Sequence, residues 1–303
     1  MSEPRHLVLV GATASGKSTL ALEAAERHGL EIVSMDSMQV YRGMDIGTAK
    51  PTGAEQDRVR HHLIDLVDPA TEWTVAEHQH RALEVLDRAD RPLLLVGGTG
   101  LYVRAVVDRL ELPGRHPDVA AELEAEPDTA ALHARLIELD PTAAARMEPD
   151  NRRRVLRALE VTIGSGRRFS SYGPGLDTHP DRPGLEFVGL APPRSVVDER
   201  IARRYETQLA EGFVDEVRQL LPVLGRTAGQ ALGYRELAAH VRGETSLDAA
   251  VDEAVRRTRR FARRQERWFR RDPRWRWLGY DESPAEVANT LDAIVAGLAR
   301  SPA

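Results

Sequence analysis

The stretch GATASGKS, from Gly11 to Ser18, decides the fold of this chain. It has the spacing G-x-x-x-x-G-K-[ST] of a P-loop, in which backbone N–H groups surround phosphate oxygens, a lysine neutralises them and a hydroxyl reaches Mg²⁺. Only two of the 42 lysine and arginine residues are lysines, and Lys17 is one of them. The loop is therefore expected to bind a diphosphate or triphosphate, with Ser18 as the Mg²⁺ ligand. The residues expected to do so are Gly11, Ala12, Thr13, Ala14, Ser15, Gly16, Lys17 and Ser18.

The segments on either side of the loop support this interpretation. The apolar run HLVLV before it is typical of a short buried strand, and STLALEAAERHG after it is typical of a helix that ends at Gly29. This order places an anion at a helix N-terminus, where unpaired N–H groups and the helix dipole favour negative charge. A chance glycine turn is the alternative, but it explains neither the flanking pattern nor the lysine.

Strands and helices alternate along most of the chain, which predicts an α/β fold with a doubly wound parallel sheet like that of P-loop NTPases. We expect a core made of residues 1–112 and 184–303, interrupted by a mainly helical insertion over residues 113–183, where prolines break short helical pieces and a Gly/Ser/Pro-rich stretch follows. The predicted strands are 6–10, 31–34, 92–96, 185–193 and a final WRWL, and the predicted helices include 18–29, 75–89 and 99–107.

Composition limits the class of protein. The chain has 303 residues, 42% of them apolar, which is enough for a substantial core. It contains no cysteine, so disulfides, zinc–thiolate sites and cysteine nucleophiles are excluded. No apolar run is long enough to cross a membrane, and the first strand begins too early to leave room for a signal peptide. We expect a cytoplasmic protein that acts as a monomer.

The positive charge is concentrated near the end of the chain. The net charge is −5, but residues 256–276 hold eleven arginines against two acidic residues. Apolar residues in this segment repeat at helical spacing, which leaves the arginines at 256, 260, 263, 267 and 270 on another face. A solvated helix face is one explanation, and contact with a nucleic acid backbone is the other. A second arginine cluster, NRRRVLRALEV, begins at Asn151.

The position of the acidic residue near the P-loop separates possible chemistries. P-loop NTPases normally hold Mg²⁺ with an aspartate at the end of a second apolar strand. Here that strand, PLLLVGGTGLY, ends in Gly97, Gly98 and Thr99, which weakens a nucleotide-hydrolysis interpretation. Asp36 instead follows the strand EIVS, at the sheet edge where ligands bind. There it can bind a ribose, hold a metal through water, act as a general base, or simply form an Asx turn.

Several longer motifs resemble the tRNA dimethylallyltransferase family, in the same order and across nearly the whole chain. The most specific is DSMQVYRGMDIGTAKP, from Asp36 to Pro51, beside the P-loop. Ala12 and Ser18 stand where the family more often has proline and threonine. The other matching motifs are HHLIDLVDP, VGGTGLYVRAVVD, RRVLRALEV, GFVDEV, ALGYREL and RRQERWFR.

The resemblance implies transfer of a dimethylallyl group from dimethylallyl diphosphate to N6 of the adenosine just 3′ of the anticodon, position 37, in tRNAs that read codons beginning with U. The P-loop would hold the donor diphosphate with Mg²⁺, Asp36 would be the base, and Arg204 and Thr99 would complete the catalytic residues. The anticodon stem-loop would be bound by the helical insertion and by Asp36, Ser37, Met38, Gln39, Thr99, Arg153, Arg154, Arg157, Gln230, Gly233, Tyr234, Arg235, Arg263, Arg264, Arg267 and Arg270.

Two other classes of function share part of this pattern. A small-molecule kinase would have the P-loop and the carboxylate after the second strand, but it would turn over ATP and would not need arginine-rich helices. A non-catalytic RNA-binding module would need the arginines but no base beside a phosphate site. Trp268 and Phe269 can stack on bases, although their helical spacing favours packing in the core. The histidines His61, His62, His78 and His80 have no metal-site pattern, because side chains at i and i+2 on a helix diverge.

Overall fold

The computed structural model describes residues 5–173, 176, 178–279 and 283–298. The chain divides into two compact units, and the second of them is the segment Asp108–Pro180. The first unit consists of the chain up to Val107 and from Asp181 onward. The sequence placed the boundaries of the insertion at residues 113 and 183, a few residues later at each end.

The first unit is built on a six-stranded sheet in which every pair of neighbours is parallel. The strand order is β3-β2-β4-β1-β5-β6, so the strand that leads into the P-loop lies in the middle. This confirms the predicted doubly wound sheet. Strand β3 has two residues and was not predicted, because so short a strand has no periodicity. The strands are β1 His6–Gly11, β2 Glu31–Ser34, β3 His61–His62, β4 Leu93–Gly97, β5 Leu185–Leu190 and β6 Arg276–Leu278.

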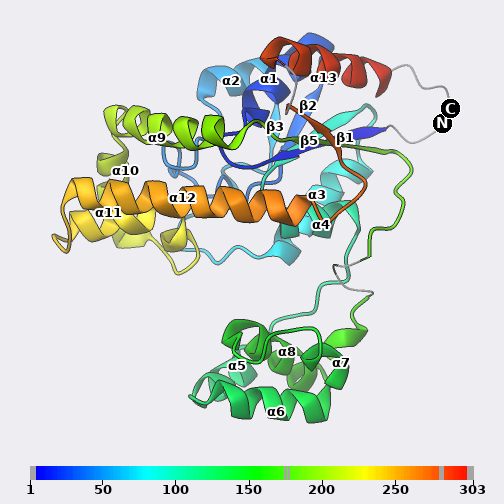
Figure 1. The fold of residues 1–303 in the computed structure, drawn as a ribbon, viewed down its shortest axis with the longest axis vertical. Helices are drawn as coiled ribbons and strands as arrows, with labels where there is room; N and C mark the ends of the chain where they lie inside the picture. Colours follow the sequence, from blue (N-terminus) through cyan, green and yellow to red (C-terminus); the bar gives the residue numbers. More distant parts are fainter. Residues whose placement is uncertain (1–4, 174–175, 177, 280–282, 299–303) are drawn as a thin grey trace. The chain divides into compact units, whose positions relative to one another are not determined.

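Successive residues of β1 point to opposite faces of the sheet and define two cores. Leu7 and Leu9 pack with helices α1, Lys17–His28, and α13, Pro284–Leu298. Val8 and Val10 pack on the other face, where α3 and α4 lie. Figure 1 shows α1 and α13 together on one side of the sheet and α3 and α4 on the other. The bounds of the last two helices are Val75–Asp87 and Gly100–Val107.

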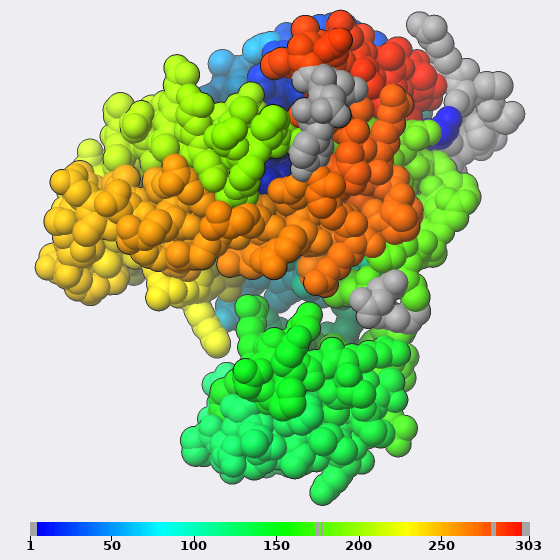
Figure 2. All heavy atoms as spheres, viewed as in Figure 1, coloured from blue at the N-terminus to red at the C-terminus, as the bar shows by residue number. Residues whose placement is uncertain are grey.

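A further group of helices extends the first unit beyond the C-terminal edge of the sheet. Helices α9 and α12 run side by side, as Figure 2 shows in yellow-green and orange, and α11 packs against α12. Together with residues 40–46 they enclose a third core, in which Tyr41, Phe213 and Tyr234 are the largest side chains that are completely buried. The elements of this region are α9 Arg194–Ala210, α10 Phe213–Leu220, η2 Leu221–Val223, η3 Ala228–Gln230, α11 Tyr234–Val241 and α12 Leu247–Phe269. Helix α2, Gly53–Arg58, lies apart from this group near α1, where Arg58 donates to Glu26 (Figure 1).

The second unit is helical and has its own core, as the sequence predicts for the insertion. Leu123, Leu136 and Leu159, from three different helices, are almost completely buried in it. Buried Asp140 accepts hydrogen bonds from the backbone N–H groups of Ala143 and Ser170, which joins the start of one helix to a later turn. Pro174 and Gly175, in the predicted glycine-rich stretch, lie outside the described residues. The elements are α5 Pro117–Glu124, α6 Thr129–Leu139, α7 Pro141–Ala144, α8 Arg152–Ser165 and η1 Phe169–Ser171.

Candidate active site

The P-loop has the backbone conformation that its glycines allow. Gly16 has φ 93°, in the left-handed region that disfavours residues with a Cβ atom, and α1 begins directly after it at Lys17. A Cβ atom on Gly11 would lie 2.5 Å from Ser15 Oγ, so the loop closes tightly on itself. The first turn of α1 contains no acidic residue. Its N–H groups and dipole are therefore directed at an anion site, and no acidic side chain of the helix itself competes for them.

Three charged residues lie close enough to one another beside this loop for their charges to interact. The ammonium group of Lys17 is enclosed, and burial lowers its pKa to about 8; the charge of Asp36 acts in the opposite direction and that of Arg204 in the same one. Burial also lowers the pKa of Arg204, while the charge of Asp36 raises it. The sequence predicted all three residues as part of the site, and the structure brings them together. Two desolvated cations and one carboxylate form a site that is well suited to a diphosphate.

Two arginines of α9 hold the P-loop from one side. Arg204 donates to Thr13 Oγ1 at 3.1 Å and to the Gly47 carbonyl at 3.2 Å. Arg200, one turn earlier, donates to the Ser15 carbonyl at 3.2 Å. The sequence analysis identified Arg204 but missed Arg200. Its position four residues before Arg204 was the signal that could have found it, because residues at this spacing share a helix face.

Asp36 forms an Asx turn with one carboxylate oxygen and leaves the other oxygen open to a ligand. Its Oδ1 accepts from the Met38 N–H at 2.8 Å, which is an Asx turn, and its own N–H donates to Ser34 Oγ at 3.4 Å. Among the described residues, no donor is recorded for its Oδ2. One oxygen therefore fixes the carboxylate and the other remains available for a ligand. Ser37 and Met38 are half-buried beside it, and Gln39 accepts from Ser34 Oγ at 2.9 Å.

The turn after β4 is joined to the P-loop by Gln265 of α12. This buried side chain accepts from the Thr13 N–H at 2.9 Å and donates to the Gly98 carbonyl at 2.8 Å. Thr99 follows in the same turn and is half-buried, and its carbonyl accepts from two N–H groups in the first turn of α4. The sequence analysis missed Gln265, because nothing in a helical repeat marks one glutamine as a bridge between two distant turns.

The residues around the P-loop fit a Mg²⁺ ion that is shared with a diphosphate. Ser18 is exposed in the first turn of α1, and its hydroxyl has no hydrogen bond within the part of the chain that the structure describes. No group of three or more histidine, cysteine or acidic side chains that could hold a metal occurs among the described residues. Mg²⁺ is commonly held by one or two protein oxygens, substrate phosphates and water, so it does not need such a group.

The arginines of α12 are of two kinds. Arg256 and Arg260 both pair with Glu253, so part of the predicted stripe is neutralised within the protein. Arg263, Arg264 and Arg267 are exposed, and no acidic partner is recorded for them among the described residues. Arg270 is exposed as well, but it pairs with Glu266 at 3.0 Å. The part of α12 nearest its C-terminus therefore carries most of the unneutralised charge.

The arginines of α8 also differ from one another. Arg153 and Arg154 are exposed, as expected for residues that contact RNA. Arg157 instead donates to the carbonyls of Pro113 and Gly114 at 2.7 and 3.0 Å and pairs with Glu160. The predicted RNA contact of Arg157 must therefore be revised, because its guanidinium fixes the loop that precedes α5.

The ALGYREL motif, residues 231–237, and Gln230 just before it hold two exposed and two buried residues of the predicted RNA-binding set. Gln230 and Arg235 are exposed and lie 3.4 Å apart through a hydrogen bond. Gly233 is buried with φ 84°, and Tyr234 is wholly buried. The structure does not support the expected RNA contact of Tyr234, because aromatic packing against Phe213 makes its ring part of the core.

Phe269 and Trp268 follow the core-packing alternative. Phe269 is 1% exposed and meets Trp275 edge to face. Trp268 is half-buried over α4, where a Cβ atom on Gly100 would lie 2.1 Å from its ring. Phe269 therefore offers no open ring face for base stacking, and Trp268 packs against the core with part of its surface exposed.

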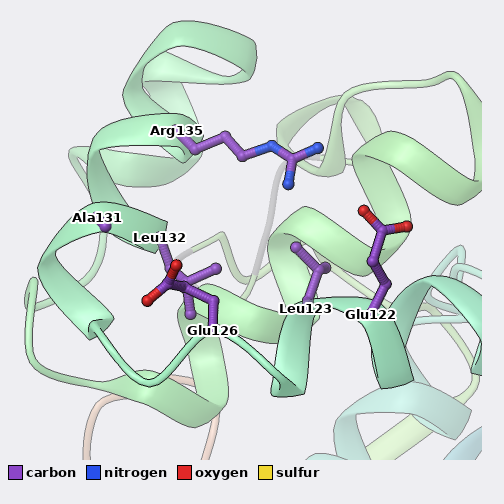
Figure 3. A pocket seen from close by; sticks show the side chains of 6 residues that line it. All are labelled: Glu122, Leu123, Glu126, Ala131, Leu132 and Arg135. Carbon is purple, nitrogen blue, oxygen red and sulfur yellow. The ribbon is translucent and has the colours of Figure 1, made fainter.

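A separate pocket lies on the second unit. It has a volume of about 180 Å³ between α5 and α6 and contains no predicted site residue. Figure 3 shows Arg135 extending across it toward Glu122. Its small size and its mixture of charges give no indication of a specific ligand.

Within the described part of the chain, no helix is long and apolar enough to cross a membrane.

Comparison with known proteins identifies the family. The model of the IPP transferase family matches residues 39–272, which is most of the chain. The tRNA dimethylallyltransferase of Streptomyces coelicolor is 49% identical over 284 residues, with 91% of this chain and 90% of that protein covered. The tRNA dimethylallyltransferase of Nocardioides sp. is 47% identical over 302 residues, and 96% of each chain is covered.

A solved structure agrees with this match. The tRNA isopentenylpyrophosphate transferase of Bacillus halodurans is 38% identical and superimposes with a TM-score of 0.69, covering 98% of this chain and 97% of that chain. Both the sheet with its P-loop and the helical insertion fall within the aligned length. The kinase and the non-catalytic RNA-binding module are thereby set aside. The chain is a transferase and belongs to the IPP transferase family.

Proposed function

We propose that this protein transfers the dimethylallyl group of dimethylallyl diphosphate to N6 of adenosine 37, directly 3′ of the anticodon, in tRNAs that read codons beginning with U, and releases diphosphate. The observation that carries this proposal is the meeting of Asp36, Lys17 and Arg204 beside the P-loop. A nucleotide hydrolase would need a carboxylate after β4, whereas the carboxylate of this site, Asp36, follows β2, which supports a role other than nucleotide hydrolysis.

In the proposed reaction, the P-loop N–H groups, Lys17 and Arg204 bind the diphosphate and stabilise the charge that grows on it as the bond from carbon to oxygen breaks. The adenine N6 forms the new bond to that carbon. Its lone pair is delocalised into the ring, so removal of its proton by Asp36 assists the attack. Ser18 would hold Mg²⁺, which supplies additional charge neutralisation when bound.

The adenine must leave its stack to reach Asp36, and this costs least in a loop. The exposed arginines of α12 and α8 support RNA binding, because phosphate contacts position a nucleic acid without reading its sequence. Gln39, Gln230 and Arg235, all in the first unit, offer further hydrogen-bonding groups. The family relatives carry the tRNA dimethylallyltransferase name, which agrees with this substrate.

The test is transfer of labelled dimethylallyl diphosphate to an unmodified anticodon stem-loop in the presence of Mg²⁺. The wild-type protein should label the adenosine 3′ of the anticodon, and labelling should stop when this base is changed. Asp36→Asn should lower the transfer rate by about 10²–10⁴-fold while both substrates still bind. Consumption of ATP without label in the RNA would contradict the proposal, as would full activity of Asp36→Asn.

A further inference from the structure

Glu216, on α10, has no role in the site described so far, yet its carboxylate accepts four hydrogen bonds. Three come from the backbone N–H groups of Asp45, Ile46 and Gly47, at 2.9, 2.8 and 3.2 Å. The fourth comes from the Tyr234 hydroxyl at 2.5 Å. A carboxylate that accepts this many bonds holds its donors strongly, because each bond is charge-assisted.

The carbonyl groups of the same turn are held by α9. The Ile46 carbonyl accepts from Gln208 Nε2 at 2.5 Å, and the Gly47 carbonyl accepts from Arg204 Nη2 at 3.2 Å. Gln208 and Arg204 are four residues apart, so they share a helix face. The turn at residues 45–47 is therefore fixed on both edges, with its N–H groups bound by Glu216 and its carbonyls bound by α9.

The turn at residues 45–47 is also held by side chains that pack against Gly47. A Cβ atom on Gly47 would lie 2.3 Å from the Phe213 ring and 2.4 Å from the Tyr234 ring. These two rings are buried and meet edge to face with their centroids 5.0 Å apart. The backbone at Gly47 therefore rests directly on two immobile rings, and only glycine fits there.

We propose that Glu216 is a positioning residue for the transfer reaction, because it fixes the turn whose Gly47 carbonyl directs Arg204 toward the P-loop. The two recorded bonds of the Arg204 guanidinium, to Gly47 and to Thr13 Oγ1, set the plane of this group beside the diphosphate site. The inference rests on the proposed function, in which Arg204 stabilises the departing diphosphate. A displacement of about 1 Å at such a group can cost on the order of 10²-fold in rate.

Tyr234 supports this arrangement through its hydrogen bond to Glu216. Burial raises the pKa of its phenol, and the neighbouring charge of Glu216 raises it further. The phenol therefore stays protonated and continues to donate to Glu216 throughout the neutral pH range. This also gives Tyr234 a role in the site that does not require contact with RNA.

A double-mutant cycle between Glu216→Gln and Arg204→Gln tests the inference, with single-turnover transfer of labelled donor to the stem-loop as the readout. The wild-type rate is measured first and decides the proposed function separately. If Glu216 acts through Arg204, then Glu216→Gln should lower the transfer rate about 10- to 100-fold when Arg204 is present. When Arg204 has already been replaced by glutamine, the same change should lower the rate less than about twofold. Effects that multiply in the double variant, or an unchanged rate in Glu216→Gln, would overturn the inference.

The control is Asp215→Asn, on the same helix, because Asp215 is exposed and pairs only with Arg218 in the described contacts. Its transfer rate should stay within about twofold of the wild type, which shows that loss of an α10 carboxylate is not itself harmful. If Glu216→Gln does not fold, Tyr234→Phe removes one of the four donors and keeps the ring. It should lower the rate in the wild type but not in Arg204→Gln, and an equal loss in both backgrounds would again overturn the inference.

Discussion

Gln265 of α12 accepts a hydrogen bond from the backbone N–H of Thr13 in the P-loop, across 252 positions of sequence. The same side chain donates to the carbonyl of Gly98. One amide thus joins the loops that follow β1 and β4, which lie next to each other in the sheet. The arginine-rich helix α12 is in this way joined to the P-loop by an uncharged side chain.

Replacing Gln265 with alanine should loosen the P-loop. The change leaves the buried carbonyl of Gly98 without this partner, which costs about 1–3 kcal/mol, and also removes the partner of the partly buried Thr13 N–H. We expect a lower unfolding midpoint in urea and a KM for the donor that is raised about tenfold. Gln219→Ala is the control, because Gln219 is exposed on α10. Donor binding that is unaffected in Gln265→Ala would show that the bridge has no role in the site.

Capture of the donor should weaken above pH 8. Burial lowers the pKa of Lys17 from 10.5 to about 8, so its positive charge is lost as the pH rises through 8 in the free enzyme. The profile of kcat/KM for the donor reports on the free enzyme. It should be flat up to about pH 7, fall to about half at pH 8 and then fall by up to about tenfold per unit.

Lys17→Arg provides the matched test of this assignment, because a guanidinium stays charged throughout this range. The variant should bind the donor less well but lose the decline above pH 8. If the decline persists in Lys17→Arg, another group is responsible for it.

The second lysine, Lys50, should not tolerate replacement by arginine. Its ammonium donates to Asp45 Oδ1 and Asp65 Oδ1 at 2.5 Å and to the Tyr41 carbonyl at 2.7 Å, and its side chain is 2% exposed. A compact group with three donors fits this site, whereas a larger planar guanidinium overpacks it. We expect Lys50→Arg to lose about 1–3 kcal/mol of unfolding free energy in urea.

Arg42→Lys serves as the comparison for Lys50, because Arg42 belongs to the same segment but forms an exposed pair with Asp68. Such pairs contribute about 0–1 kcal/mol, so this exchange should be close to neutral. If Lys50→Arg and Arg42→Lys had equal unfolding free energies, the Lys50 site would not require a compact ammonium group.

The unneutralised arginines of α12 should contribute more to RNA binding than the paired ones. Arg263→Gln with Arg267→Gln should weaken binding of the stem-loop and reduce the slope of log K against log salt by about 0.7–0.9 for each lost phosphate contact. Arg256→Gln with Arg260→Gln changes the formal charge equally but removes groups already paired with Glu253. Equal effects of the two double variants on the slope would contradict this distinction.

The sequence predicts the parts of the fold that depend on local pattern. The strand, loop and helix around Lys17 have the expected order, and Asp36 lies beside the P-loop because parallel strands end at one edge of the sheet. The burial of Phe269 also follows from its helical spacing. In each case a repeat of two or of three to four residues specifies the environment.

Residues whose role depends on a distant partner could not be predicted in this way. Nothing local distinguishes Glu216 from Asp215, although the first binds a turn about 170 residues earlier and the second is exposed. Similarly, Arg157 matched an RNA-binding motif, but carbonyls of the loop before α5 engage its guanidinium. These contacts are set by how the helices pack, which a single sequence pattern does not contain.

The position of β1 between β4 and β5 has a consequence for synthesis on the ribosome. Strand β5 begins at Leu185, after the whole second unit, so β1 has only one neighbour while residues 108–184 are translated. At 5–20 residues per second this interval lasts about 4–15 seconds. During that time an apolar strand edge stays unpaired, which is a known route to aggregation. The nascent chain is therefore expected to need protection by chaperones over this interval, and its phosphate site is completed only when α12 has emerged.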